Sequence, residues 1–266
     1  MGIVTNKTLW ASDIHYLNDS EELRNFGSRL DAEILARIES GHSQIETLKQ
    51  LRTWLPSRIS GGPMLFVGSF TENGNLLSQW RGYCPHGKGV SIGFEPDLLV
   101  ASAHRASFSF GRCVYDQVVQ GRIAGEVVDN ILELARGSEP SLKHHVSQSW
   151  HELFQSIEPL LLRIAALMKH SSFREEQEWR LVSQVFANYV KPPILYREGV
   201  STLLPYLEIP LPTKLHHEKE ALAILHTIIG PTPSPNLSMG SVSKYLSRAG
   251  VAPNRVSNSG IPYRRT

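Results

Sequence analysis

The spacing of apolar residues changes near residue 60, and this change restricts the fold classes open to the chain. Before it, apolar residues recur every three or four positions, as on one face of a helix. After it, the run Met64–Thr71 has the pattern of a β-strand. The chain is therefore expected to combine packed helices with strands. The two helical series are Leu23, Phe26, Leu30, Ile34 and Ile38, followed by Ile45, Leu48, Leu51 and Leu55.

Capping and turn residues indicate where these two helices begin and end. Asp19 can cap the first helix, and Glu22, three residues later, completes a capping-box pattern. Pro56 and the breaker 60–63 are predicted to end the second helix. The two helices are then expected to pack as a hairpin.

The rest of the chain mixes helices and strands without a regular βαβ alternation. This order favours an α+β fold, with small mixed or antiparallel sheets and flanking helices, over a doubly wound sheet. Further helices are predicted at 118–135, 153–168 and 241–248, and further strands at 89–94, 107–115, 179–185, 203–209, 224–229 and 255–256.

Composition and charge narrow the functional classes. A length of 266 residues with 41% hydrophobic and 20% charged residues fits a globular chain of one large domain or two small ones. The net charge is only +2, and the basic residues form no cluster in the sequence, so nucleic acid is not indicated as a partner. Cys84 and Cys113 form no zinc-ligand spacing. With no secretory leader and no apolar run near the ~20 residues of a membrane span, a cytoplasmic protein is expected.

The tract from Lys169 to Val182 places charged residues beside the start of a predicted strand. If the segment is extended, Glu176 and Glu178 share one face, and neighbouring like charges push one pKa upward. Such a carboxylate pair can form a catalytic site. The alternative interpretation is a solvated helix end before a buried strand, with Arg174 and Arg180 pairing locally.

Two other segments carry polar or aromatic groups that could contact a ligand. Ser69 and Thr71 lie at a strand end and could hydrogen-bond a ligand, or could only satisfy backbone groups. Trp80 and Tyr83 flank Arg81 and offer stacking surface, although a single tryptophan is more often a core residue. The Gly-rich phosphate frames GxxxxGK[ST] and GxGxxG do not occur, nor do GxSxG and HExxH.

Four blocks in order resemble the bacterial DUF2971 family, whose function is unknown. The blocks are 9–13 with 16–22; 69–72 with 77–80, Tyr83 and 87–94; Lys169, Phe173, Glu176, Glu178, Trp179 and Arg180; and 228–231 with Val256, Ser257 and 261–264. The resemblance implies a single domain over 1–266, with a helical insertion around 116–170. It also implies that the chain lacks the family's usual His-Tyr-Thr-like first strand, which would hold a ribose.

The DUF2971 family is in turn similar, remotely, to ADP-ribosyltransferases, in which a Ser/Thr-bearing strand and a Glu-x-Glu strand flank a nicotinamide site. This resemblance implies NAD as cofactor, an unidentified acceptor and no metal. It implies Glu178 as the main catalytic residue, with Glu176 assisting. The residues implied to bind the cofactor are Ser69, Thr71, Trp80, Tyr83 and Arg180.

Two other classes of function remain open from the residues. In a non-catalytic binding or regulatory module, Glu176 and Glu178 would be locked in salt bridges. In a metal-dependent nuclease or hydrolase, Asp19 would join the two glutamates as an oxygen ligand, although no ligand frame is recognisable. The binding or regulatory module is expected to show a closed ionic network around Glu176 and Glu178. An NAD-cleaving effector of a defence or toxin system is expected to show a cleft that contains Ser69 and Glu178.

Overall fold

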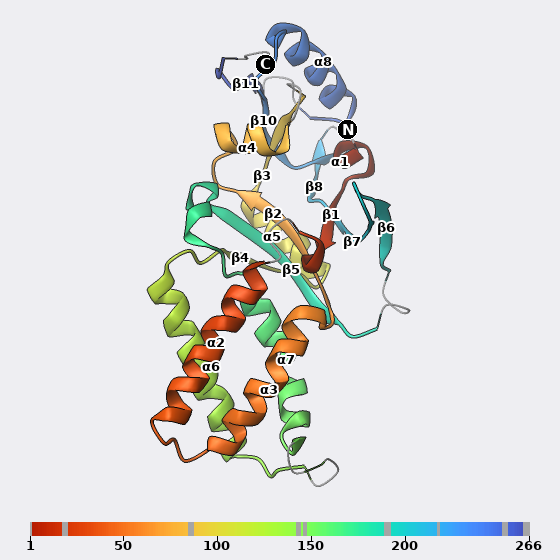
Figure 1. Cartoon of the computed structure of the whole chain (residues 1–266). Helices are drawn as coiled ribbons and strands as arrows, with labels where there is room; N and C mark the ends of the chain where they lie inside the picture. The colour runs from red at the N-terminus through yellow and green to blue at the C-terminus, as the bar shows by residue number, and fades with distance from the viewer. Residues whose placement is uncertain are drawn as a thin grey trace.

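A six-stranded antiparallel sheet lies in the middle of the molecule, between a helical bundle and a smaller three-stranded sheet (Figure 1). The computed structural model describes residues 2–17, 21–84, 88–141, 145, 148–188, 193–216, 219–251 and 255–262. The strand order is β4-β5-β2-β1-β7-β6. These strands are β1 (Thr8–Asp13), β2 (Met64–Thr71), β4 (Ser109–Arg112), β5 (Glu178–Phe186), β6 (Leu195–Glu198) and β7 (Leu203–Pro210).

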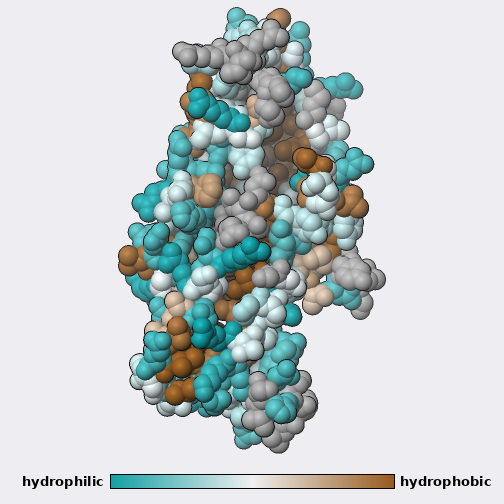
Figure 2. Space-filling model, in the orientation of Figure 1, coloured by the Kyte–Doolittle hydropathy of each residue, from teal (hydrophilic) through white to brown (hydrophobic). Residues whose placement is uncertain are grey.

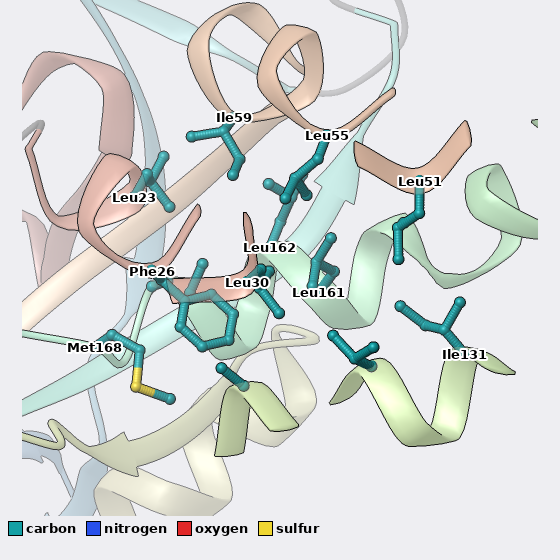
Figure 3. Packing of buried hydrophobic residues seen from close by; sticks show 14 of the residues in the cluster. Leu23, Phe26, Leu30, Leu51, Leu55, Ile59, Ile131, Leu161, Leu162 and Met168 are labelled. Carbon is teal, nitrogen blue, oxygen red and sulfur yellow. The ribbon is translucent and has the colours of Figure 1, made fainter. Parts of the chain in front are cut away.

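Four helices pack as a bundle on one face of this sheet (Figure 1). Figure 3 shows their apolar side chains converging, Phe26 and Leu30 from one helix meeting Leu161 and Leu162 from another. Val67 and Val182 of the sheet belong to the same buried cluster. The bundle consists of α2 (Glu21–Glu39), α3 (Ile45–Gly61), α6 (Gln117–Arg136) and α7 (His151–Ala165).

The predicted hairpin of the first two helices is confirmed, but Pro56 does not end the second one. Helix α3 continues to Gly61 with Pro56 inside it, although proline removes one helical hydrogen bond. Ile59, beyond the proline, is buried and lies so close to Gly27 of α2 that a β-carbon there would be 2.4 Å from its Cδ1. Burial of Ile59 offsets the lost hydrogen bond, so the helix runs on. The predicted cap at Asp19 lies outside the described residues.

The other face of the sheet carries a second apolar cluster, formed with shorter elements. Phe66, Leu181 and Ile209 of the sheet pack there with Leu99 of α5 and Leu246 of α8. The elements on this side are α1 (Gly2–Asn6), α5 (Pro96–Arg105), the hairpin of β8 (Thr213–His216) and β9 (Lys219–Leu222), and α8 (Pro235–Arg248).

The three-stranded sheet has the order β11-β10-β3 and lies at the end of the molecule opposite the bundle (Figure 1). Strand β11 pairs with β10 in parallel, as an edge strand. Helix α4 lies between β2 and β3 in the chain, where no helix was predicted, and Trp80 buries its ring there. The elements are β3 (Val90–Phe94), β10 (Ile224–Ile229), β11 (Val256–Asn258) and α4 (Leu77–Tyr83).

The predicted α+β class is confirmed, and the long strand expected at 107–115 is shorter, at Ser109–Arg112. Figure 2 shows hydrophilic and hydrophobic residues mixed on one face, with a hydrophobic area at the bundle end. Among the described residues, no helix combines the length and hydropathy that a membrane span needs.

Candidate functional site

Strand pairing brings the hydroxyl-bearing strand and the Glu-x-Glu segment side by side. In the antiparallel ladder of β2 and β5, Thr71 lies opposite Glu178 and Ser69 opposite Arg180. Residues that lie opposite one another point to the same face of a sheet. Four of the residues predicted for the site therefore share one face, the face that the bundle covers farther along at Val67 and Val182.

Lys169 lies between the two glutamates. Its ammonium Nζ is 2.5 Å from Glu176 Oε2 and also contacts Glu178 Oε2. The backbone fixes its position, since the Lys169 N–H donates to the Val114 carbonyl at 3.0 Å and its own carbonyl accepts from Gln120 Nε2 at 2.8 Å. The Lys169 side chain is only 3% exposed. It is thus a buried cation that joins two carboxylates.

Arg180 binds the Glu178 carboxylate from the other side with two nitrogens. Its Nε donates to Oε1 at 2.7 Å, and its second terminal nitrogen donates to Oε2 at 3.2 Å. Its remaining terminal nitrogen donates to the Ala166 carbonyl at 2.7 Å, at the end of α7. This bidentate geometry is the strong form of the arginine–carboxylate pair, so both Glu178 oxygens carry a cationic partner.

The surroundings of Glu178 keep its carboxyl ionised. Burial alone raises the pKa of Glu178, but the charges and hydrogen bonds of Arg180 and Lys169 outweigh burial and hold that pKa below its ordinary value. The predicted upward push from a like charge is therefore wrong for Glu178, because Lys169 lies between the two carboxylates. The Glu178 N–H donates to the Tyr115 hydroxyl at 2.8 Å, and burial raises the pKa of Tyr115 to about 12.

Glu176 reaches the site from a turn, which corrects the expectation of an extended segment. It ends the 3-10 helix η4 (Ser171–Glu176), and Gln177 then adopts a left-handed conformation with φ +44°. The Thr71 hydroxyl donates to the Glu176 carbonyl at 2.7 Å and fixes this turn. The Glu176 side chain is 21% exposed, against 6% for Glu178. The two carboxylates meet through Lys169, and Glu176 is the one that solvent reaches.

Trp80 and Tyr83 lie in α4, away from the paired ends of β2 and β5. Trp80 is buried against Gly89 and Gly230 of the small sheet region, where a β-carbon on Gly230 would be 2.8 Å from its ring. Its indole N–H donates to Asn75 at 2.9 Å, and Tyr83 is exposed. The geometry gives Trp80 a core role, and ligand contact by either residue stays a prediction.

Sequence reasoning missed two groups that hold the site together, Tyr115 and Gln120. Tyr115 was expected only as a strand end, and Gln120 only as a position in an amphipathic helix. Each acts on a residue more than 45 positions away in the chain, and no local pattern indicates such a contact. The contacts of Tyr115 and Gln120 were therefore not predictable from the tract itself, whereas the local pairing of Arg180 was one of its two interpretations and is present at Glu178.

A metal site at the two glutamates does not fit the observed contacts. The Lys169 ammonium occupies the position between the carboxylates that a metal cation would take. Among the described residues, no group of three His, Cys, Asp or Glu side chains could hold a metal ion. Asp19, the third ligand of that hypothesis, lies outside the described residues.

Comparison with known proteins gives a family match over part of the chain and no function. No curated protein and no solved structure matches the chain. The profile of the DUF2971 family, described as a protein of unknown function, matches residues 79–181. That range contains Lys169, Glu176, Glu178 and Arg180, and begins after the end of β2. The predicted resemblance to the DUF2971 family is confirmed over residues 79–181, where the profile matches.

Proposed function

We propose that this chain is an ADP-ribosyltransferase-like or NAD-cleaving bacterial protein, acting in the cytoplasm as a defence or toxin effector. The observation that carries the proposal is the pairing of β2 with β5. It sets Thr71 opposite Glu178 and Ser69 opposite Arg180, on one sheet face. The resemblance to ADP-ribosyltransferases implies a hydroxyl-bearing strand beside the Glu-x-Glu segment, and here Glu178 begins β5 while Glu176 lies in the turn before it.

In this reaction the bond between ribose C1′ and the nicotinamide nitrogen breaks, and the electron pair leaves with nicotinamide. Positive charge develops at the ribose, and water or an acceptor nucleophile then forms the new bond to C1′. Glu178 suits the stabilising role because its lowered pKa keeps it anionic at neutral pH. Ser69 and Thr71 can orient the substrate, and Arg180 or Lys169 can pair with a phosphate.

The same contacts support a second function, a non-catalytic binding or regulatory module. Glu178 is 5% exposed, and Lys169 and Arg180 hold both of its oxygens. Two carboxylates and two cations balance in charge, as in a structural network. In the enzymatic proposal Lys169 must therefore leave Glu178 when substrate binds, and Glu176, which is more exposed, keeps it as a partner.

The two functions separate in an assay of nicotinamide release from NAD. The wild-type chain is expected to release nicotinamide, and Glu178→Gln is expected to lower the rate about a hundredfold or more. Glu158→Gln is the matched control, because Glu158 is also a buried glutamate paired with an arginine, Arg58, but lies in the bundle. It should leave the rate unchanged.

Three results would count against catalysis by Glu178 or leave it without support. Release that survives Glu178→Gln removes Glu178 from the mechanism. Equal loss in both glutamine variants indicates damage to folding rather than to chemistry, which circular dichroism of each variant checks. No release from the wild type, together with no NAD binding by calorimetry, assigns the network a structural role.

A further inference from the structure

Arg197 of β6 carries a charge that the described residues do not balance. It is partly buried, and no carboxylate of the described residues lies within ion-pair distance of it. One terminal nitrogen donates to the Ser12 hydroxyl at 3.2 Å, while Nε is buried without a hydrogen-bond partner. A partly buried cation with an unsatisfied donor is costly unless an anion joins it. Arg197 is thus a candidate anion-binding group.

Trp10 of β1 lies beside Arg197 and presents a fixed aromatic surface. The Arg197 guanidinium lies over its ring, 5.6 Å from the centroid, and the Tyr206 ring is 4.7 Å away. The indole N–H donates to Glu208 Oε1 at 3.2 Å. Trp10 nevertheless remains 44% exposed. An aromatic ring that is held in place and still open can stack a planar ligand without a large entropic cost.

Strand registers place this pair on the same sheet face as the Glu178 cluster, but on other strands. Ser12 lies opposite Val67 on one side and opposite Tyr206 on the other. Side chains two residues apart along a strand point to the same face. Trp10 therefore shares a face with Ser12 of β1, and Ser69 shares that face with Val67 of β2. The Trp10 and Arg197 pair therefore occupies the β1-β7-β6 half of the sheet, and the Glu178 cluster occupies the β2-β5 half.

We propose that Trp10 and Arg197 form a nucleotide-binding site, which stacks a base on the indole and pairs its phosphate with the guanidinium. An aromatic side chain such as tryptophan stacks on the π-face that every base has, so it tolerates any base. The planar guanidinium matches phosphate oxygens in two-nitrogen contacts. The Ser12 hydroxyl, which accepts a hydrogen bond from Arg197, adds a polar group on the same face. This site does not depend on NAD cleavage, because none of its groups belongs to the Glu178 network.

Isothermal titration calorimetry with AMP tests the site on the full chain. Wild-type protein is expected to bind AMP, and Arg197→Gln and Trp10→Leu are each expected to weaken binding about tenfold or more. Trp10→Phe, which keeps a stacking ring, should stay within about threefold of wild type. Arg248→Gln, at an exposed arginine of α8, is the charge control and should bind AMP as wild type does.

Each other outcome overturns the proposal. If wild type does not bind AMP, or if Arg197→Gln and Trp10→Leu bind it as wild type does, the pair is only a surface cluster. If inorganic phosphate binds as tightly as AMP and Trp10→Leu has no effect, the site holds a simple anion and no nucleotide. Thermal unfolding of each variant, with Trp10→Phe as the conservative reference, separates lost binding from lost folding.

Discussion

Replacing Lys169 with methionine tests the ionic network most sharply. Methionine keeps most of the side-chain volume, so the change removes the charge and leaves two carboxylates without their shared cation. Removing one partner of a buried ion pair costs about 3–5 kcal/mol. Because Arg180 still binds both oxygens of Glu178, we expect the lower part of this range, a loss of about 3 kcal/mol in the free energy of unfolding at pH 7.

The free energy of unfolding that Lys169→Met loses should become smaller as the pH falls. Folding lowers the pKa of Glu178 below its ordinary 4.5, so its stabilisation is complete above the unfolded-state pKa and is lost as pH falls through the folded-state pKa. Without Lys169 the folded-state pKa of Glu178 moves back toward 4.5. The difference between wild type and Lys169→Met should therefore be largest near neutral pH and shrink below about pH 4 as the carboxylate takes up a proton.

Urea unfolding at pH 7 and at acidic pH measures both effects. Lys49→Met is the control, because Lys49 pairs with Glu46 on the surface, where an ion pair contributes about 0–1 kcal/mol. A loss in Lys169→Met no greater than in Lys49→Met would refute the reasoning. So would a large loss that stays constant as pH falls, because it would arise from packing and not from charge.

Three further changes test the backbone account by urea unfolding. Gln177→Gly should raise the free energy of unfolding by about 1 kcal/mol, because glycine adopts φ +44° without strain, and an unchanged or lower value would contradict this. Gly250→Ala should lower it by about 1–2 kcal/mol, since φ is +83° and the new β-carbon would be 2.9 Å from Ala221; a neutral result would refute the steric argument. Pro56→Ala should raise it by about 1–2 kcal/mol by restoring a helical hydrogen bond, and a loss would show that the proline fits α3 without strain.

Local periodicity predicted most of the fold. The apolar series of α2 and α3, the run Met64–Thr71 and the helix at Gln117–Arg136 are strong patterns, and the structure confirms each element. Pro56 shows where a local rule fails, because tertiary burial of Ile59 outweighs the helix-breaking tendency. Elements such as β1 and α5 were not predicted, because their short apolar patterns depend on which face the sheet buries.

The sequence indicated which residues form the candidate site better than it indicated how they are arranged. Motif resemblance selected Glu176, Glu178, Arg180, Ser69 and Thr71, and the β2-β5 register sets the last four side by side. The turn at Gln177 and the cover from Lys169 depend on contacts with distant backbone, which sequence spacing does not encode. Whether a carboxylate pair is extended or folded back is thus decided by the tertiary structure.

A crystal structure of the chain with a non-cleavable NAD analogue tests the central claim most directly. The account predicts that the nicotinamide ribose lies within hydrogen-bond distance of the Glu178 carboxylate, beside the hydroxyls of β2, and that Lys169 has left Glu178. A complex in which Lys169 still joins Glu176 to Glu178, with the analogue bound elsewhere or not at all, would contradict it and leave these charges a structural network.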